Sequence, residues 1–209
     1  MGNLKEYLES STYIDWQHPK IVDTAQAIAQ KGKGKVQIAS ACFEFVRDEI
    51  KHSWDYQLNP VTCRASDVLE QRTGYCFAKS HLLAALLRAN QIPAGLCYQR
   101  LATGDDASPY CLHGLNAVYL EAYGWYRIDA RGNKPGVAAA FSPPLEKLAF
   151  LIGVEGEADL PEIWAEPIPV VVHCLETCQT FQEVSANLPD IQIIKASGFA
   201  SVDRVVVPS

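Results

Sequence analysis

The chain has 209 residues, of which 48% are apolar and 20% charged, and these values are typical of a globular protein. Its net charge of −6 argues against the basic surface that nucleic-acid binding requires. The sequence shows neither a secretory signal nor an apolar run long enough to cross a bilayer. We therefore expect one cytoplasmic domain over residues 1–209, without nucleic-acid or membrane partners; nothing in the sequence sets an oligomeric state.

Helical periodicity dominates the first ninety residues. The pattern predicts a short helix over 24–30 and, after a glycine-containing joint, an amphipathic helix over 36–50. A brief helix is expected over 66–71, where Ser and Asp provide N-cap chemistry. The next helix, over 76–89, is apolar almost all round, which a helix tolerates only at the centre of a domain.

Strand patterns follow this helix. They predict strands over 95–101, 115–121 and 125–130, with a surface connection over 102–109. The remainder is rich in proline, and one more helix is expected over 170–186. Helices followed by an antiparallel sheet and an irregular C-terminal part indicate the α+β class.

Seven cysteines are present, with no CxxC pair and no spacing typical of a zinc site. In a reducing compartment they are expected to be free thiols. Only one of them stands clearly at the start of a helix, where the helix dipole and free N–H groups stabilise a thiolate. That residue is Cys76, whereas inert or packing roles are expected for Cys42, Cys63, Cys97, Cys111, Cys174 and Cys178.

A thiol nucleophile also needs a base and a group that orients the base. His81 follows Cys76 by five helical positions, about 140° around the axis, so it faces elsewhere. His113 precedes one predicted strand, and Asp129 stands near the end of the next. A sheet packed on the helix would bring Cys76, His113 and Asp129 together. The remaining histidines are expected to be surface or capping groups: His18, His52 and His173.

The length of the hairpin loop decides whether His113 and Asp129 share a face. A two-residue loop at Ala122 and Tyr123 would place Asp129 opposite a residue whose side chain points away from His113. A three-residue loop over 121–123 would make His113 the diagonal neighbour of Asp129, within about 7 Å. We therefore predict an odd-length loop or a bulge.

The segment SDVLEQRTGYCFAKSHLLAALLRANQIPAG, followed by HGLNAVYL and GWYRIDARG, resembles the core of the transglutaminase-like superfamily, in its small bacterial type. The three motifs agree in order and spacing over residues 36–133. The resemblance implies a papain-like fold, in which a buried helix carrying the nucleophile packs on an antiparallel sheet carrying His and Asp. Residues 1–35 and 134–209 lie outside it, as an N-terminal helical extension and a C-terminal extension that wraps the core or cleft.

Carried onto this sequence, the resemblance makes Cys76 the nucleophile, His113 the base and acid, and Asp129 the orienting carboxylate. It implies acyl transfer from an amide or ester carbonyl through a thioester. Transfer to water would give a protease or deamidase, and transfer to an amine would give cross-linking. We expect hydrolysis of a protein or peptide substrate, with no cofactor and no metal.

The oxyanion that forms in such a reaction needs hydrogen-bond donors. The backbone N–H of Cys76 is the first expected donor. Candidates for the second donor are Gln57, Trp54 and Gln71. Candidates for substrate binding are Tyr75, Ser80 and Trp164.

Two alternatives stay open. RTGYC also resembles the cysteine motif of the arylamine N-acetyltransferases, which use the same three residues with acetyl coenzyme A, although Thr73 replaces that family's usual second glycine. From another class comes an inactive transglutaminase-like module that only binds a peptide or protein. The presence of all three residues, Cys76, His113 and Asp129, argues against the inactive module.

Overall fold

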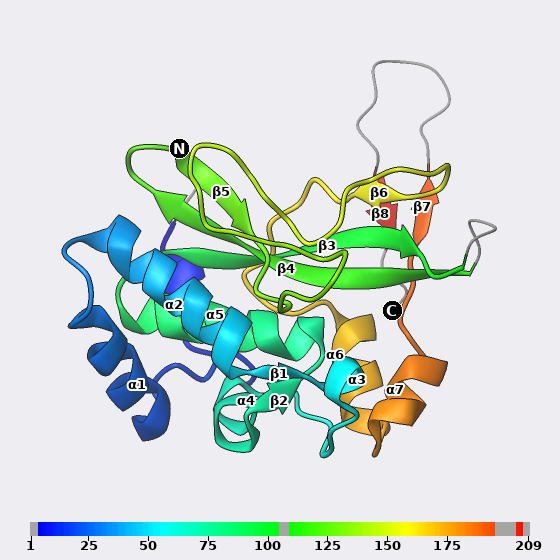
Figure 1. The fold of residues 1–209 in the computed structure, drawn as a ribbon, viewed down its shortest axis with the longest axis horizontal. Coiled ribbons are helices and arrows are strands. Elements are labelled where there is room, and N and C mark those ends of the chain that lie inside the picture. The colour runs from blue at the N-terminus through cyan, green and yellow to red at the C-terminus, as the bar shows by residue number, and fades with distance from the viewer. Residues whose placement is uncertain (1–3, 105–108, 195–203, 207–209) are drawn as a thin grey trace.

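A four-stranded antiparallel sheet carries a layer of helices on one face (Figure 1). The computed structural model describes residues 4–104, 109–194 and 204–206. The helices are η1 (Glu6–Leu8), α1 (Pro19–Ala29), α2 (Lys35–Glu49), α3 (Ser53–Tyr56), α4 (Ala65–Gln71), α5 (Cys76–Ala89), α6 (Pro169–Thr177) and α7 (Phe181–Ala186). The strands are β1 (Lys51–His52), β2 (Thr73–Gly74), β3 (Ala94–Ala102), β4 (Tyr110–Leu120), β5 (Gly124–Ile128), β6 (Ala158–Asp159), β7 (Gln192–Ile194) and β8 (Arg204–Val206).

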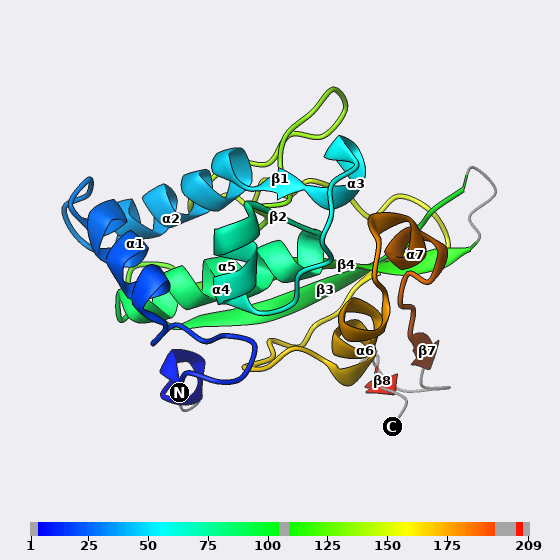
Figure 2. The ribbon, with the colours of Figure 1, turned by 90° about the horizontal axis from the view of Figure 1, so that it is seen from below.

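Helix α5 is the centre of the core. It contacts β3 and β4 on one side and α1, α2 and α4 on the other, so the expectation of a helix surrounded by protein is confirmed (Figure 2). Every side chain from Leu82 to Leu87 is fully buried. Burial on all sides explains why this helix has no polar face.

Two buried cations tie α5 to its neighbours through backbone carbonyls. Lys79 donates from Nζ to the carbonyl of Ile50 at 2.5 Å, at the C-terminal end of α2. The guanidinium of Arg88 donates to three carbonyls, those of Glu9 at 2.8 Å, Ala94 at 3.0 Å and Ala165 at 2.5 Å. Arg88 thereby joins the N-terminal segment, the start of β3 and the segment before α6.

The main sheet has the order β5-β4-β3-β6 with antiparallel neighbours. Leu120 pairs with Gly124, so three residues, 121–123, connect β4 and β5. The predicted odd-length loop is therefore confirmed. Asn116 pairs with Ile128 in the same register, which carries Asp129 to the position beside Leu115 and leaves it diagonal to His113.

Three predicted elements differ from the structure. Helix α1 begins at Pro19 rather than residue 24, because proline is well accommodated in a first helical turn. Strand β4 begins at Tyr110, so His113 lies within the strand and not before it. The single helix expected over 170–186 is two helices, because the backbone at Cys178 is extended and Thr180 caps the second by accepting from the Glu183 N–H.

The chain after residue 133 packs against the sheet and its edge. Trp164 exchanges two backbone hydrogen bonds with Leu96 of β3, and β6 pairs with the same strand. Further along, the carbonyl of Pro189 accepts from the N–H of Leu112 on β4 at 2.7 Å. Among the described residues, no helix is long and apolar enough to cross a membrane.

The approach of β4 to the start of α5 requires a glycine. A Cβ added at Gly114 would lie 3.0 Å from Cα and 3.2 Å from N of Phe77, the second residue of α5. These are backbone atoms of the central helix, which cannot move aside without moving the core. Only a residue without a side chain allows this spacing.

We predict that Gly114→Ala lowers the free energy of unfolding by about 1–3 kcal/mol, because the added methyl group forces β4 away from α5. Urea denaturation measures this change. Gly153→Ala is the matched control, because a Cβ there meets nothing within 4 Å, and it should stay within about 0.5 kcal/mol of the wild type. Equal unfolding midpoints for the two variants would contradict this role of Gly114.

Candidate active site

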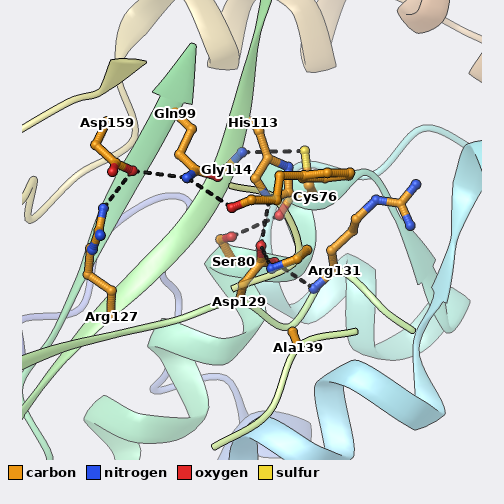
Figure 3. Close-up of polar contacts among 12 residues, drawn as sticks. Cys76, Ser80, Gln99, His113, Gly114, Arg127, Asp129, Arg131, Ala139 and Asp159 are labelled. Atoms are coloured by element: carbon orange, nitrogen blue, oxygen red, sulfur yellow. Dashed lines mark hydrogen bonds and ion pairs between the residues drawn. The ribbon is translucent and has the colours of Figure 1, made fainter. Parts of the chain in front are cut away.

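Cys76 is the first residue of α5 and faces β4 (Figure 3). The short parallel pair of β1 and β2 leads into it, since β2 ends at Gly74 and Tyr75 is the N-cap of the helix. The N–H of Gly114 on β4 donates to Cys76 Sγ at 3.5 Å. The thiol thus receives a backbone donor from the sheet as well as the positive end of the helix dipole.

His113 and Asp129 form a buried hydrogen-bonded pair beside this thiol. His113 Nε2 lies 2.8 Å from Asp129 Oδ2, as the loop length requires. His113 and Cys76 line one cavity, and the N–H of Gly114, the residue after His113, donates to the thiol, so the structure brings the three predicted residues together. Phe150 packs against the His113 ring at 4.9 Å between ring centroids, nearly perpendicular to it. The orientation of the imidazole is therefore set from several sides.

The Asp129 carboxylate is held by backbone groups from two segments. The N–H of Arg131 donates to Oδ1 and the N–H of Ala149 donates to Oδ2, both at 3.1 Å. The second donor belongs to the chain after residue 133. A part of the chain outside the expected core therefore contributes directly to the site.

Electrostatics favour a charged His113 in these surroundings. Burial alone would lower the pKa of the His113 imidazole, but the charges of Asp129 and Cys76 and hydrogen bonds to both raise it to about 10. Burial would raise the pKa of Asp129, but His113 and the two backbone N–H groups lower it below its usual value. The two residues form an imidazolium–carboxylate pair.

A cavity of about 740 Å³ opens beside Cys76 and His113. Two of its lining residues lie well exposed, Trp54 at 47% and Leu151 at 87%, so the cavity opens to solvent. Arg131 lines it as well and is held by two hydrogen bonds to Asp55. Most of the wall is apolar and includes Leu101, Leu112, Leu148, Phe150, Leu151 and Leu188.

The other predicted site residues divide into two groups. Trp54 and Tyr75 line the cavity. Gln57, the C-cap residue of α3, and Gln71, the last residue of α4, are exposed and are not among the residues that line the cavity.

Two expected substrate-binding residues have structural roles instead. The hydroxyl of Ser80 donates to the carbonyl of Cys76 at 2.8 Å, within helix α5. Trp164 bonds to Leu96 through its backbone, and its ring packs on Tyr98 at 5.3 Å. The Ser80 hydroxyl and the Trp164 ring therefore make contacts within the fold, and neither residue is among the described residues that line the cavity.

His52 was expected at the surface or as a capping group; it is the N-cap residue of α3, although its side chain makes no capping hydrogen bond, and it does not lie at the surface. It is only 6% exposed and lines the same cavity as Cys76. Its strand, β1, is two residues long, too short to show a periodic pattern in the sequence. The parallel pairing of His52 with Gly74 places it beside the residues that lead into α5.

All seven cysteines are free thiols. Burial raises the pKa of five of them to about 12, which keeps them protonated and unreactive near neutral pH. Cys111 is the useful comparison, because it lines the same cavity as Cys76. The five residues are Cys42, Cys63, Cys97, Cys111 and Cys174.

Two solved structures are similar to part of this chain. A protein from Cytophaga hutchinsonii described as a candidate cysteine protease has 22% identity and a TM-score of 0.50, over 63% of this chain and 43% of its own. The periplasmic domain of TgpA from Pseudomonas aeruginosa has 20% identity and a TM-score of 0.47, over 61% of this chain and 46% of its own. This chain thus spans less than half of each structure. No curated protein matches the sequence.

The family model of the transglutaminase-like superfamily matches residues 22–130. The match includes Cys76, His113 and Asp129, and it also includes most of α1, which was expected to lie outside the resemblance. It covers more than half of the 209 residues. The chain belongs to the transglutaminase-like superfamily.

Proposed function

We propose that this protein is a cysteine-dependent acyl-transfer enzyme that hydrolyses an amide bond of a protein or peptide. The observation that carries the proposal is that Cys76 and His113 line one solvent-accessible cavity and that His113 Nε2 lies 2.8 Å from Asp129 Oδ2. Membership of the superfamily and the family-like fold support it. In this proposal Cys76 is the nucleophile, His113 the proton carrier and Asp129 the orienting group.

The first half-reaction forms a thioester. The Cys76 thiolate attacks the carbonyl carbon, and the backbone N–H at the start of α5 donates to the oxygen that becomes negative. The C–N bond breaks as His113 gives its proton to the leaving amine. Asp129 keeps the imidazole oriented and stabilises its positive charge.

The second half-reaction releases the acyl group. Neutral His113 takes a proton from a water molecule, whose oxygen attacks the thioester carbon. The C–S bond breaks, and the products are a carboxylic acid and the regenerated thiolate–imidazolium pair. The apolar wall of the cavity, including Leu112 and Phe150, suits an acyl donor with an apolar side chain next to the reacting carbonyl.

We expect His113→Gln to lower the alkylation rate of Cys76 by iodoacetamide at pH 7 by about tenfold or more, because the imidazolium that stabilises the thiolate is lost. The gap should narrow toward pH 10, where His113 of the wild type loses its own proton. Peptide-resolved mass spectrometry measures each thiol separately. Cys111 should react slowly in both proteins, and wild-type Cys76 reacting no faster than Cys111 at pH 7 would refute the activated thiol.

Asp129→Asn should reduce acylation by p-nitrophenyl acetate by about 10²-fold or more, because an amide can favour the wrong imidazole tautomer and cannot balance its charge. Stopped-flow release of p-nitrophenolate measures the acylation step. Asp67→Asn makes the same chemical change on the exposed side of α4 and serves as the control. A similar rate for the two variants would remove Asp129 from the proposed mechanism.

Hydrolysis and amine transfer can be separated with peptide substrates in water enriched in ¹⁸O. We expect the label to enter the new carboxylate even when methylamine is present, and Cys76→Ser should abolish incorporation. Cleaved peptide bonds would identify a protease, and ammonia release from glutamine side chains would identify a deamidase. Methylamide as the main product would overturn the hydrolytic proposal in favour of cross-linking chemistry.

A further inference from the structure

His52 is a second imidazole beside the reactive thiol, and the steps above do not use it. It lines the cavity that contains Cys76 and His113. His113 approaches this cavity from the sheet, whereas His52 belongs to the β1–β2 pair that leads into the start of α5 (Figure 1). Its ring packs edge-on against Tyr75, the N-cap of α5, at 5.4 Å between centroids.

The hydrogen bonding of His52 is incomplete. Its Nδ1 is buried and has no hydrogen-bond partner in the described structure. The carboxylate of Asp55 lies 3.8 Å away, beyond hydrogen-bond distance, and its oxygens already accept from Arg131 and Lys134. A histidine more than nine-tenths buried seldom stays without a partner. Its Nε2 also forms no hydrogen bond with the described residues, so a ligand in the cavity can accept one there.

The surroundings keep this imidazole neutral. Burial and the positive charge of Arg131 lower the pKa of His52 well below 6.5, although Asp55 opposes the shift. Lys79 and His113 act in the same direction as Arg131. A neutral imidazole carries one N–H donor and one lone pair. The tautomer with the proton on Nε2 can donate to a ligand in the cavity, and it leaves the lone pair on Nδ1, which Asp55 does not approach within hydrogen-bond distance.

We propose that His52 is the second hydrogen-bond donor to the carbonyl oxygen of the substrate, acting from Nε2 together with the backbone N–H of Cys76. The inference rests on the proposed acyl-transfer function and assigns the donor that the sequence left open. A neutral donor held by the fold stabilises the oxyanion without reorganising during the reaction. It also leaves His113 as the proton carrier of the site.

Trp54 is the rival donor, because its indole N–H also belongs to a residue that lines the cavity. Trp54 is 47% exposed, and its ring touches Phe181 at 5.9 Å between centroids. His52 is buried and is fixed by strand pairing and by Tyr75. His52 is therefore the better oxyanion donor, because a side chain already held in place needs no reorganisation during the reaction.

The test compares two reactions of Cys76. Alkylation by iodoacetamide needs the thiolate but forms no oxyanion, whereas acylation by p-nitrophenyl acetate forms one. His52→Phe keeps an aromatic ring against Tyr75 and removes the donor, whereas His52→Gln keeps a side-chain N–H. We expect His52→Phe to slow acylation by about 10²–10³-fold and to change alkylation by less than about threefold. The loss should appear in kcat rather than KM, and His52→Gln should recover at least about tenfold.

Several results would overturn the assignment. Equal losses in both reactions would make His52 a support of the thiolate, and unchanged acylation in His52→Phe would leave it without a role. Trp54→Phe showing the selective loss instead would assign the donor to Trp54. Wild-type protein that is never acylated would refute the acyl-transfer function itself, and the inference with it. Urea denaturation of each variant ensures that folded proteins are compared.

Discussion

The close contact between β4 and the first turn of α5 is the constraint on which the site depends. Gly114 allows this contact because a side chain there would meet the backbone of Phe77. The same contact brings the Gly114 N–H to Cys76 Sγ and places His113, one residue earlier, beside the thiol. The close contact of β4 with α5 is therefore required both for the packing of the core and for the geometry of the site.

The Asp129 carboxylate extends this constraint to the C-terminal part of the chain. It accepts from the N–H of Arg131, just beyond β5, and from the N–H of Ala149, which lies twenty residues after Asp129 in the sequence. The segment around Ala149 also supplies Phe150 against the His113 ring and Leu148 to the cavity wall. Asp129 thus orients the His113 imidazole and also holds the segment that forms part of the cavity wall. The wall and the reacting groups are therefore linked through one carboxylate.

The neighbours of the two buried histidines near the thiol favour a positive charge on His113 and a neutral His52. His113 faces Asp129 and Cys76, and these negative groups outweigh the effect of burial. His52 lies near Arg131, and burial and positive charge act in the same direction. The same side chain can therefore serve as proton carrier at one position and as neutral donor at another.

The sequence by itself determined the elements with strong local signals and the identity of the central residues. A helical pattern that is apolar almost all round predicted α5 with its observed bounds, and the motifs that resemble the superfamily indicated Cys76, His113 and Asp129. Loop parity also linked the His113–Asp129 contact to an odd-length loop or a bulge, and the loop has three residues. These features are predictable because periodicity and strand alternation are properties of neighbouring residues.

Tertiary structure alone decided the surroundings of these residues. Ser80 and Trp164, polar and aromatic candidates in the sequence, are used by the helix and the sheet edge. His52, in a strand too short for a pattern, is buried beside the thiol, and Ala149 donates to Asp129 through its backbone N–H. Such roles come from contacts between distant segments and, for a backbone donor, do not depend on the identity of the side chain.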